Sequence, residues 1–585
     1  MAFRKYAFYA LLSAILLILA LSFFYFLHTN YNALCTRLLT SINKLNRAEE
    51  FKQKYFTKKL FYSIRILSGV LLLMGVVAAL FLKNRSYAAF NYLINSILYF
   101  LINVRSFFSN SFKGNKYLII YAIILLVITC FNIFQQPIMY DEATTGIDYI
   151  RSGVIPSAIY YNAPNNHIFY NVLSSIIYKI PLDLKIESRI VDLLIIFSCF
   201  IILFRLLERY YGKNIALIST TLFCYCFPIM LYAFQARGYL MLTFFALIQI
   251  YSALKIISNA TQNSRFYWMT FSLSSILGFY TMPSFLYPYV AINIFLLFCG
   301  GNSVGQIKTL IINNIIIGII VLLLYTPVFV VNGVQAVTNN QYVQRQSLGI
   351  ILNSMIPYLM GVYGWLMGIN NNLGAIPAFI LFVILLVNML RHSDQHLKAI
   401  RILSIIFILS PFFILPIHRA IPFNRNWIYL VVPFIFCFSE LLLSVSAVKS
   451  HLKLNFINSR MIAFMSSFLI ILLGLFYFNE KVKIENSYTV DLANYSKIKL
   501  NDIKTIYSNN FLGETYMLFD IYRCDHRKHI SISRNDSTIS GNDVIILNSG
   551  TDPVLVNRIQ KMNNYILLFS NYRMIVFVRN DLIKS

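Results

Sequence analysis

The chain has 585 residues, of which 58% are hydrophobic and only 12% charged, and its mean hydropathy is +0.66. Soluble domains carry about 25% charged residues, so this composition excludes an ordinary water-soluble protein. A formal net charge of +27 would suggest nucleic-acid binding in a soluble chain. Here the basic residues lie mostly in short clusters between apolar runs, as in the cytoplasmic loops of membrane proteins, which argues against nucleic acid as a partner.

Thirteen apolar runs are long enough to cross a bilayer, because a membrane-spanning helix needs about 20 mainly apolar residues. A weaker run at 88–104 would make a fourteenth. We therefore expect an all-α polytopic membrane protein with 13–14 transmembrane helices. The thirteen runs lie at 7–28, 62–82, 117–135, 187–207, 214–232, 239–257, 267–282, 284–299, 309–330, 373–390, 402–417, 427–447 and 461–478.

The lysine and arginine clusters indicate the orientation of these helices. Clusters at 209–213, 391–401 and 449–460 fall on one side if the spans alternate, and the positive-inside rule assigns that side to the cytoplasm. We therefore expect a multi-pass protein of the cell inner (plasma) membrane. Its non-cytoplasmic side would carry the loops 136–186 and 331–372 and the C-terminal tail.

We expect residues 1–116 to form an N-terminal extra transmembrane region. The loop 29–61 within it is strongly basic, so we expect that loop on the cytoplasmic side. This placement requires the 88–104 run to span the membrane and the N-terminus to lie outside.

The rest of the chain divides into a transmembrane core, 117–479, and a tail, 480–585. The tail holds 11 of the 22 acidic residues. Its short β-type runs at 543–548, 565–569 and 574–578 are separated by turn residues, with a helix expected at 553–561. We expect the tail to form a small extracytoplasmic α/β domain.

The acidic residues of the core gather in the first large outer loop. Residues 1–479 contain only 11 acids, and six of them lie between 141 and 192. Asp141, Glu142 and Asp148 follow the 117–135 span directly. Carboxylates at a membrane boundary are costly to dehydrate, so this cluster indicates a cation, a proton or a hydroxyl substrate as partner. The alternative is a solvated loop that happens to be acidic.

The same loop continues with a proline, asparagines and a histidine at 161–170, which supply turn geometry and hydrogen-bonding groups without charge. Asn165, Asn166 and His167 precede an apolar segment that we expect to lie as a helix along the membrane interface, up to Lys179. His167 either has its ring satisfied by water or faces the carboxylates.

Three arginines stand on the expected outer side, where the charge rule predicts few. Arg237 lies in the short turn Gln235-Ala-Arg-Gly-Tyr239, and Arg419 and Arg425 lie in the segment 418–427. Arginine near a membrane end often extends to lipid headgroups. The alternative partner is a phosphate, which guanidinium binds with two parallel hydrogen bonds.

Together these residues resemble the polyprenyl-phosphate-sugar-dependent glycosyltransferases of the GT-C fold. Within that group the chain is most similar to the bacterial relatives of the protein O-mannosyltransferases and the lipid A aminoarabinose transferase. The resemblance rests on Asp141-Glu142, on Pro164-Asn-Asn-His167 and on 235–239, and it covers about 117–450.

The chain departs from this family at two positions and in its N-terminal region. The family often has Glu where Gln235 stands and a histidine in the outer segment that here reads Tyr280-Thr-Met-Pro283. Residues 1–116 precede the usual start of the fold.

The resemblance implies a sugar donor of the undecaprenyl-phosphate type and a hydroxyl acceptor on a protein, lipid or glycan. It implies that Asp141 is the catalytic acidic residue with Glu142 in support, and that Arg237 or Arg425 holds the phosphate. It leaves open whether a divalent cation binds at Asp141 and Glu142. The residues expected to bind substrate are Asn165, Asn166, His167, Arg237, Tyr239, Arg419 and Arg425.

Two other functions compete with this one. A transporter or flippase of lipid-linked saccharides usually places charges near the bilayer midplane, often in repeated halves, whereas these charges gather at one face. A polymerase or ligase of surface polysaccharide shares the lipid-linked donor, but its large outer loop is expected late in the chain.

Overall fold

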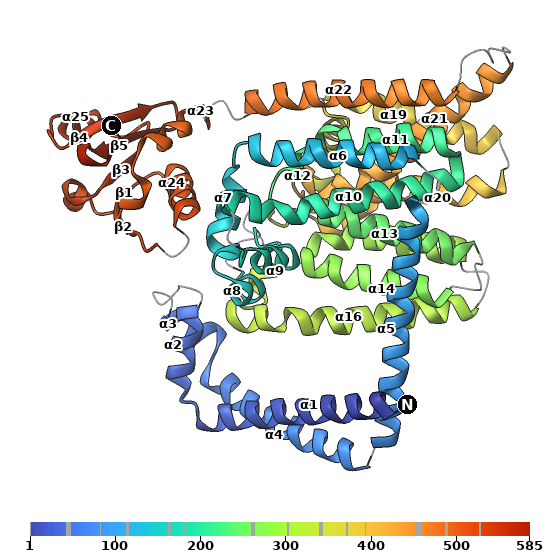
Figure 1. Ribbon diagram of the computed structural model, residues 1–585, viewed down its shortest axis with the longest axis horizontal. Coiled ribbons are helices and arrows are strands. Elements are labelled where there is room, and N and C mark those ends of the chain that lie inside the picture. Colours follow the sequence, from blue (N-terminus) through green and yellow to red (C-terminus); the bar gives the residue numbers. More distant parts are fainter. Residues whose placement is uncertain are drawn as a thin grey trace.

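The computed structural model is mainly helical, with a small β-sheet near the C-terminus (Figure 1). Most helices of the core run side by side as a bundle. We call the end of the bundle that carries Asp141 the Asp141 end, and the end that carries Arg209, Lys213, Arg391 and Lys398 the basic end. The residues described are 2–41, 48–81, 83–112, 116–161, 165–180, 183–258, 264–300, 304–338, 343–369, 372–391, 394–451, 459–485, 489–525 and 528–584.

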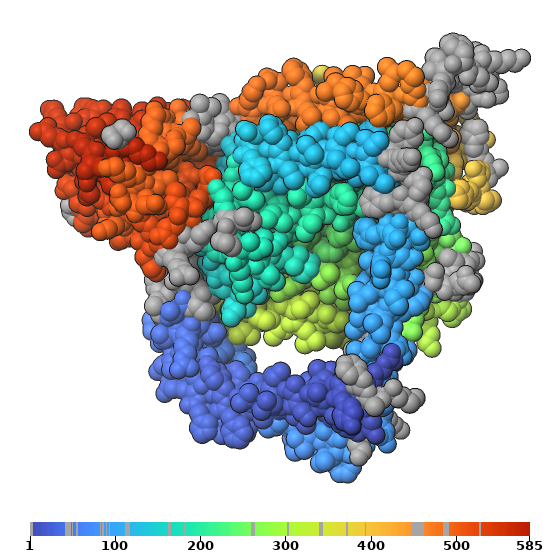
Figure 2. Space-filling model, viewed as in Figure 1, coloured from blue at the N-terminus to red at the C-terminus, as the bar shows by residue number. Residues whose placement is uncertain are grey.

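Two long helices form an N-terminal hairpin beside the bundle. They are α1 (Ala2–His28) and α4 (Lys58–Phe81), joined by α2 (Tyr31–Ser41), α3 (Ala48–Glu50) and the π-helical turn η2 (Phe51–Tyr55). The apolar stretches of α1 and α4 are almost wholly exposed, as suits helices that face lipid. Figure 2 shows an opening between this hairpin and α16 (Val304–Asn332) of the bundle.

The expected topology of the N-terminal region is wrong in this structure. Helix α5 (Lys83–Phe112) crosses the bundle helices instead of running alongside them (Figure 1), and it is not among the helices apolar enough to span. It packs near the basic end, where the Arg265 guanidinium lies 4.4 Å from the Tyr92 ring centre. Asparagine, serine and arginine residues along α5 make it amphipathic, which favours an interfacial position.

The basic loop after α1 consequently lies at the Asp141 end. Tyr31 and Phe56 of that loop pack in one hydrophobic cluster with Tyr149, Tyr160 and Val331. A hairpin of two spans returns the chain to the basic end, so α5 need not cross.

Twelve helices of the described chain are long and apolar enough to cross a membrane, or up to 13 if a bent pair counts as one span. That pair is α11 (Lys213–Tyr225) and α12 (Phe227–Ala233), bent by 61°. The chain is therefore a multi-pass membrane protein. The remaining helices of the core are α6 (Lys116–Gln135), α10 (Leu184–Tyr211), α13 (Tyr239–Ile257), α14 (Ser264–Thr281), α15 (Leu286–Gly300), α17 (Gln335–Thr338), α18 (Leu348–Leu366), α19 (Ala375–Arg391), α20 (Gln395–His418), α21 (Val431–His451) and α22 (Ser459–Glu485), with 3-10 turns η5 (Pro283–Phe285), η6 (Asn372–Gly374) and η7 (Asn424–Leu430).

The sequence suggested a loop at 331–372. This prediction is wrong, because the segment contains the apolar helix α18. The chain still passes the bundle only once between Gln346 and His396. Gln346 donates its backbone N–H to Arg419 O at the Asp141 end (2.7 Å), and His396 Nε2 lies 3.0 Å from Arg209 O at the basic end. Helices α18 and α19 therefore make one net passage together.

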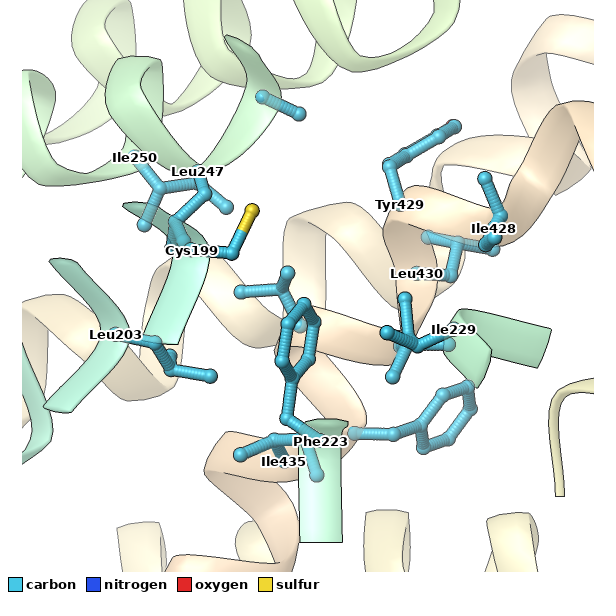
Figure 3. Close-up of a cluster of buried hydrophobic side chains, with 14 of the residues drawn as sticks. Cys199, Leu203, Phe223, Ile229, Leu247, Ile250, Ile428, Tyr429, Leu430 and Ile435 are labelled. Atoms are coloured by element: carbon cyan, nitrogen blue, oxygen red, sulfur yellow. The ribbon is translucent and has the colours of Figure 1, made fainter. Parts of the chain in front are cut away.

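The centre of the bundle is a closely packed apolar core. Figure 3 shows side chains from α10, α11, α12, α13, η7 and α21 meeting there. Since lipid is as apolar as these side chains, close packing rather than removal from water holds such helices together. The labelled residues are Cys199, Leu203, Phe223, Ile229, Leu247, Ile250, Ile428, Tyr429, Leu430 and Ile435.

A buried ion pair joins four helices in the basic half of the bundle. Arg401 Nε and Nη2 lie 2.8 and 2.9 Å from the two carboxylate oxygens of Glu440. Tyr211 and Asn388 donate further hydrogen bonds to the same carboxylate. A buried charge needs such partners, and these partners fix α10, α19, α20 and α21 against one another.

The tail forms an α/β domain, as expected. Its sheet has the order β2-β1-β3-β5-β4, with β1 parallel to β2 and β3, and β5 antiparallel to β3 and β4. Three strands and the helix α25 coincide with the predicted runs. The elements are α23 (Thr489–Leu492), η8 (Ala493–Lys497), η9 (Leu500–Asp502), β1 (Thr505–Ser508), α24 (Phe511–Cys524), β2 (Ser531–Ser533), η10 (Asp536–Gly541), β3 (Val544–Asn548), α25 (Pro553–Gln560), β4 (Tyr565–Ser570), β5 (Met574–Arg579) and η11 (Asn580–Leu582).

Candidate active site

The predicted acid pair lies on a short helix at one end of the bundle. Helix α7 (Tyr140–Thr145) has Asp141 and Glu142 in its first turn and runs directly into the π-helical turn η3 (Gly146–Ile150). Carboxylates in the first turn of a helix are favoured because the unpaired N–H groups there carry partial positive charge. The segment continues through α8 (Val154–Ile159) to α9 (Ile168–Ile177), the short apolar helix that the sequence predicted.

Glu142 is fully buried and all its acceptor positions are used. Arg189 of α10 donates from Nε to Oε1 (2.5 Å) and from Nη2 to Oε2 (2.7 Å). The backbone N–H groups of Ala236 and Met139 donate to the same two oxygens. The other Arg189 N–H groups bind the carbonyls of Ile133, Gln136 and Pro137.

Asp141, in contrast, keeps 39% of its side chain exposed and faces two guanidinium groups. Arg237 Nη1 lies 3.2 Å and Arg425 Nη1 3.3 Å from Asp141 Oδ2. The exposed fractions of the two arginine side chains are 2% and 30%. Asn165 connects the group, because it donates to Asp141 O (3.2 Å) and accepts from Arg237 Nη1. The structure thus brings the early acid and two late arginines together.

Arg425 has one unpaired hydrogen-bond donor among the described residues. Its Nε is buried and has no hydrogen-bond partner among the described residues. Buried donors are normally paired, so this N–H calls for an acceptor, which the described residues do not supply. The guanidinium is held over Phe423, with 4.5 Å from Cζ to the ring centre, and over Tyr239 at 5.5 Å.

His167 fixes the turn that presents Arg237. Its Nδ1 accepts the Gly238 backbone N–H at 2.7 Å, and its ring meets Tyr239 edge-on at 4.9 Å. Burial lowers the pKa of His167 well below its usual value, and the positive charges of Arg237 and Arg425 lower it further. A neutral ring with its proton on Nε2 matches the acceptor role of Nδ1.

Gly238 is required at this turn by space. A Cβ placed there would lie 2.8 Å from His167 Cβ and 2.9 Å from Thr281 Cγ2. Real Cβ atoms do not approach other heavy atoms so closely, so any other residue would displace the turn or the His167 and Thr281 side chains beside it. The histidine, the glycine and the arginine therefore act as one unit.

Two of the predicted substrate-binding residues do not join this cluster. Asn166 is buried and ties the loop to itself, donating to Ser157 O (2.9 Å) and Tyr160 O (2.7 Å). Arg419 is exposed at the end of α20 with a left-handed backbone (φ 56°). In the described part of the chain it forms no ion pair with Asp141.

Solved structures share this architecture. ArnT from Cupriavidus metallidurans bound to undecaprenyl phosphate matches with a TM-score of 0.52 at 10% sequence identity, over 81% of this chain and 100% of that chain. Its apo state matches with a TM-score of 0.50 at 10% identity, over 78% of this chain and 97% of that chain. An oligosaccharyltransferase from Archaeoglobus fulgidus has a TM-score of 0.38 at 11% identity, over 80% and 74% of the two chains. No protein-family model and no curated protein matches the sequence.

The chain has the GT-C fold. At the positions where the chain departs from the expected pattern, Gln235 and Thr281 lie next to the turn that carries Arg237. Gln235 accepts the Arg237 backbone N–H at 2.7 Å. Tyr280, in the segment that often carries a histidine, packs against Phe169 and Tyr325, and Thr281 contacts Gly238.

A divalent cation held jointly by Asp141 and Glu142 does not fit this site. Both oxygens of Glu142 are already engaged by Arg189 and by backbone N–H groups, so the carboxylate has no free lone pair for a metal. Asp141 alone would then have to hold the ion, beside two guanidinium groups whose positive charges repel it.

Sequence reasoning missed Arg189, although a signal was present. This arginine stands inside the apolar run 187–207, and a charge within a membrane-spanning segment indicates a specific partner. Its partner is Glu142, which the sequence pattern suggested as a helper of Asp141 in the reaction. Glu142 instead anchors α7 to α10.

Proposed function

We propose that the chain is a membrane glycosyltransferase that moves a sugar from a polyprenyl-phosphate-linked donor to a hydroxyl acceptor. The observation that supports this proposal is the half-exposed Asp141 carboxylate between Arg237 and Arg425, at one end of a GT-C fold. A base beside two cations suits a reaction in which a hydroxyl loses a proton while a phosphate leaves.

In the proposed reaction the acceptor oxygen attacks the anomeric carbon of the sugar. The bond from that carbon to the phosphate oxygen breaks, and its electron pair leaves with the lipid phosphate, with inversion at the sugar. Arg237 and Arg425 neutralise the phosphate, and the free Nε of Arg425 gives it one more donor. Once the phosphate has taken over the guanidinium groups, Asp141 accepts the hydroxyl proton.

The proposed location is the outer face of the cytoplasmic membrane. Arg209, Lys213, Arg391 and Lys398 at the basic end favour the cytoplasm for that end, which would put Asp141 and the C-terminal domain outside. The loop after α1 is an exception to this rule. Reporter fusions after Asn214 and after Glu480 should report opposite compartments, and one shared compartment would refute the orientation.

Asp141→Asn tests the reaction directly. The variant keeps size and polarity but cannot take a proton, so turnover should fall by about 10²–10⁴ while donor binding survives. The assay uses purified protein, a panel of undecaprenyl-phosphate sugars and hydroxyl acceptors, with Asp148→Asn as control. Chelator should leave the wild-type rate unchanged. Transfer by Asp141→Asn at the wild-type rate would refute the role of Asp141 as the base. Absence of transfer by the wild type with every donor and acceptor would refute the proposed function and favour a transporter of lipid-linked saccharides.

A further inference from the structure

The C-terminal domain is packed directly on the helix that carries Asp141. Helix α24 of that domain meets α7 and η3, and the buried Phe519 ring fills the space over Gly146. A Cβ on Gly146 would lie 2.8 Å from Phe519 Cε2. The backbone of Gly146 is ordinary helix (φ −61°), so glycine is needed here for room and not for conformation.

The contact belongs to the core of the domain itself. Ala143 and Ile150, on either side of Gly146, share one buried hydrophobic cluster with Met517 and Phe519 of α24. The same cluster continues into the sheet through Ile546. One face of the α7–η3 segment is therefore part of the interior of the C-terminal domain.

Polar contacts tie α24 to the segment after η3 and to the start of α10. Arg523 of α24 binds Asp183, just before α10, with Nη2–Oδ2 at 2.6 Å and Nε–Oδ1 at 2.9 Å. Arg151, just after η3, lies with Cζ 3.5 Å from the Tyr522 ring centre and donates to Lys528 O (2.9 Å). These contacts hold α24 against the bundle on both sides of the Phe519–Gly146 contact.

Asp141 is close enough to Gly146 to follow its movements. The two residues lie five positions apart on a continuous helical segment, or about 7 Å along its axis. On its other side α7 is fixed by the buried Glu142–Arg189 pair. Asp141 thus stands at the N-terminal end of a helix held between the bundle and the C-terminal domain.

We propose that the C-terminal domain positions the proposed catalytic base, with Phe519 and Gly146 as the decisive contact. This inference rests on the proposed function. If it holds, the C-terminal domain affects the rate of transfer to every acceptor, including small acceptors that do not touch the domain. Its role is then not limited to recognising acceptors. Phe519 is a positioning residue, because it acts through α7 and touches no substrate.

A compensating pair of substitutions tests the contact. Gly146→Ala should displace α7 and lower kcat by about tenfold to a hundredfold with little change in acceptor KM, because small misplacements of a reacting group are that costly. Phe519→Leu removes the atom that the new Cβ would meet, so Gly146→Ala/Phe519→Leu should recover to within about threefold of Phe519→Leu alone. Tyr572→Ala, an exposed position in the same domain, is the matched control.

Hydrogen exchange of the backbone gives a readout that does not require activity. Gly146→Ala should raise exchange in 140–150 by about tenfold, with α13 and α21 still protected, and the double variant should restore protection. If adding Phe519→Leu to Gly146→Ala restores neither kcat nor the protection of 140–150, the positioning role is refuted. An inactive wild type with the expected exchange pattern would instead refute the proposed function alone.

Discussion

Asp141 and Glu142 are adjacent in sequence and on the same turn of one helix, yet their surroundings are opposite. Glu142 is buried, and two guanidinium nitrogens and two backbone N–H groups occupy its oxygens. Asp141 is 39% exposed, and its two arginine neighbours approach it through one oxygen, at distances above 3 Å. A carboxylate with saturated hydrogen bonds holds structure, whereas one with loose, replaceable partners can exchange them for a substrate.

The pair at the other end of the bundle supports this distinction. Glu440 and Arg401 are buried and closely paired, with Tyr211 and Asn388 completing the carboxylate's partners. Nothing in that network is exposed to an incoming ligand. Glu142–Arg189 therefore resembles this structural pair more than it resembles its own neighbour in sequence.

Breaking Glu142–Arg189 should have the largest effect on stability. Glu142→Ala leaves Arg189 charged and buried without its partner, a change that costs about 3–5 kcal/mol. We expect Glu142→Ala and Glu440→Ala each to lower the unfolding temperature and yield of purified protein strongly, while Asp141→Ala changes them little. Glu142→Leu/Arg189→Met should recover part of the loss. Wild-type unfolding of Glu142→Ala would contradict the comparison.

The arginines of Asp141 should affect donor binding more than stability. Replacing Arg237 or Arg425 with Ala removes a charge-assisted contact of about 1.5–3 kcal/mol, or about tenfold or more in donor affinity. Arg237 should be the more sensitive because it is buried, and Lys should rescue only partly because it lacks the fork geometry. Titration with undecaprenyl phosphate measures this. Full affinity in both Lys variants would instead indicate that the two arginines only contact lipid headgroups. Arg419→Ala serves as the control.

His167 should make the turn at Arg237 sensitive to acid. Its pKa is lowered in the folded protein by burial and by Arg237 and Arg425, so below about pH 6.5 the unfolded chain binds the proton more readily than the folded one. Stability is therefore lost as pH falls below that value, and a protonated Nδ1 can no longer accept from Gly238. Between pH 8 and about pH 5, the unfolding temperature should fall less in His167→Asn than in the wild type. Equal losses would contradict this.

The sequence located much of this site because charges stood where the membrane rule forbids them. Asp141, Arg237 and Arg425 were all predicted on that ground, and the structure brings them together, although their roles stay predictions. Arg419 satisfied the same rule, and Asn166 was predicted from the polar residues of its loop, but both side chains lie outside the cluster. The distribution of charges indicates on which side of the membrane a residue lies, but it does not indicate the direction of the side chain.

Other features depend on contacts that no local pattern encodes. The Glu142–Arg189 pair spans 47 positions, and the Phe519–Gly146 contact joins the tail to the first outer loop. Helix α18 was missed because Asn353, Ser354 and Pro357 interrupt its apolar run. The crossing direction of α5 is set by its packing on the bundle, near Phe107 and Tyr251, which composition alone does not reveal.

The smallest expected effect concerns Asp520, a carboxylate between the two extremes. Burial raises its pKa to about 6. The Arg523 guanidinium, with Nη1 3.3 Å from Asp520 Oδ1, opposes this shift only in part. Between about pH 4 and pH 6 the folded protein binds this proton more readily than the unfolded chain, so this contribution to stability declines as pH rises through that window. Asp520→Asn removes the cost of the buried charge and leaves the Arg523–Asp183 pair in place. We expect the variant to be at least as stable as wild type at pH 8 and to lose the dependence between pH 4 and 6, measured by thermal unfolding. A marked loss of stability at pH 8 would show that Asp520 is a saturated structural carboxylate like Glu142.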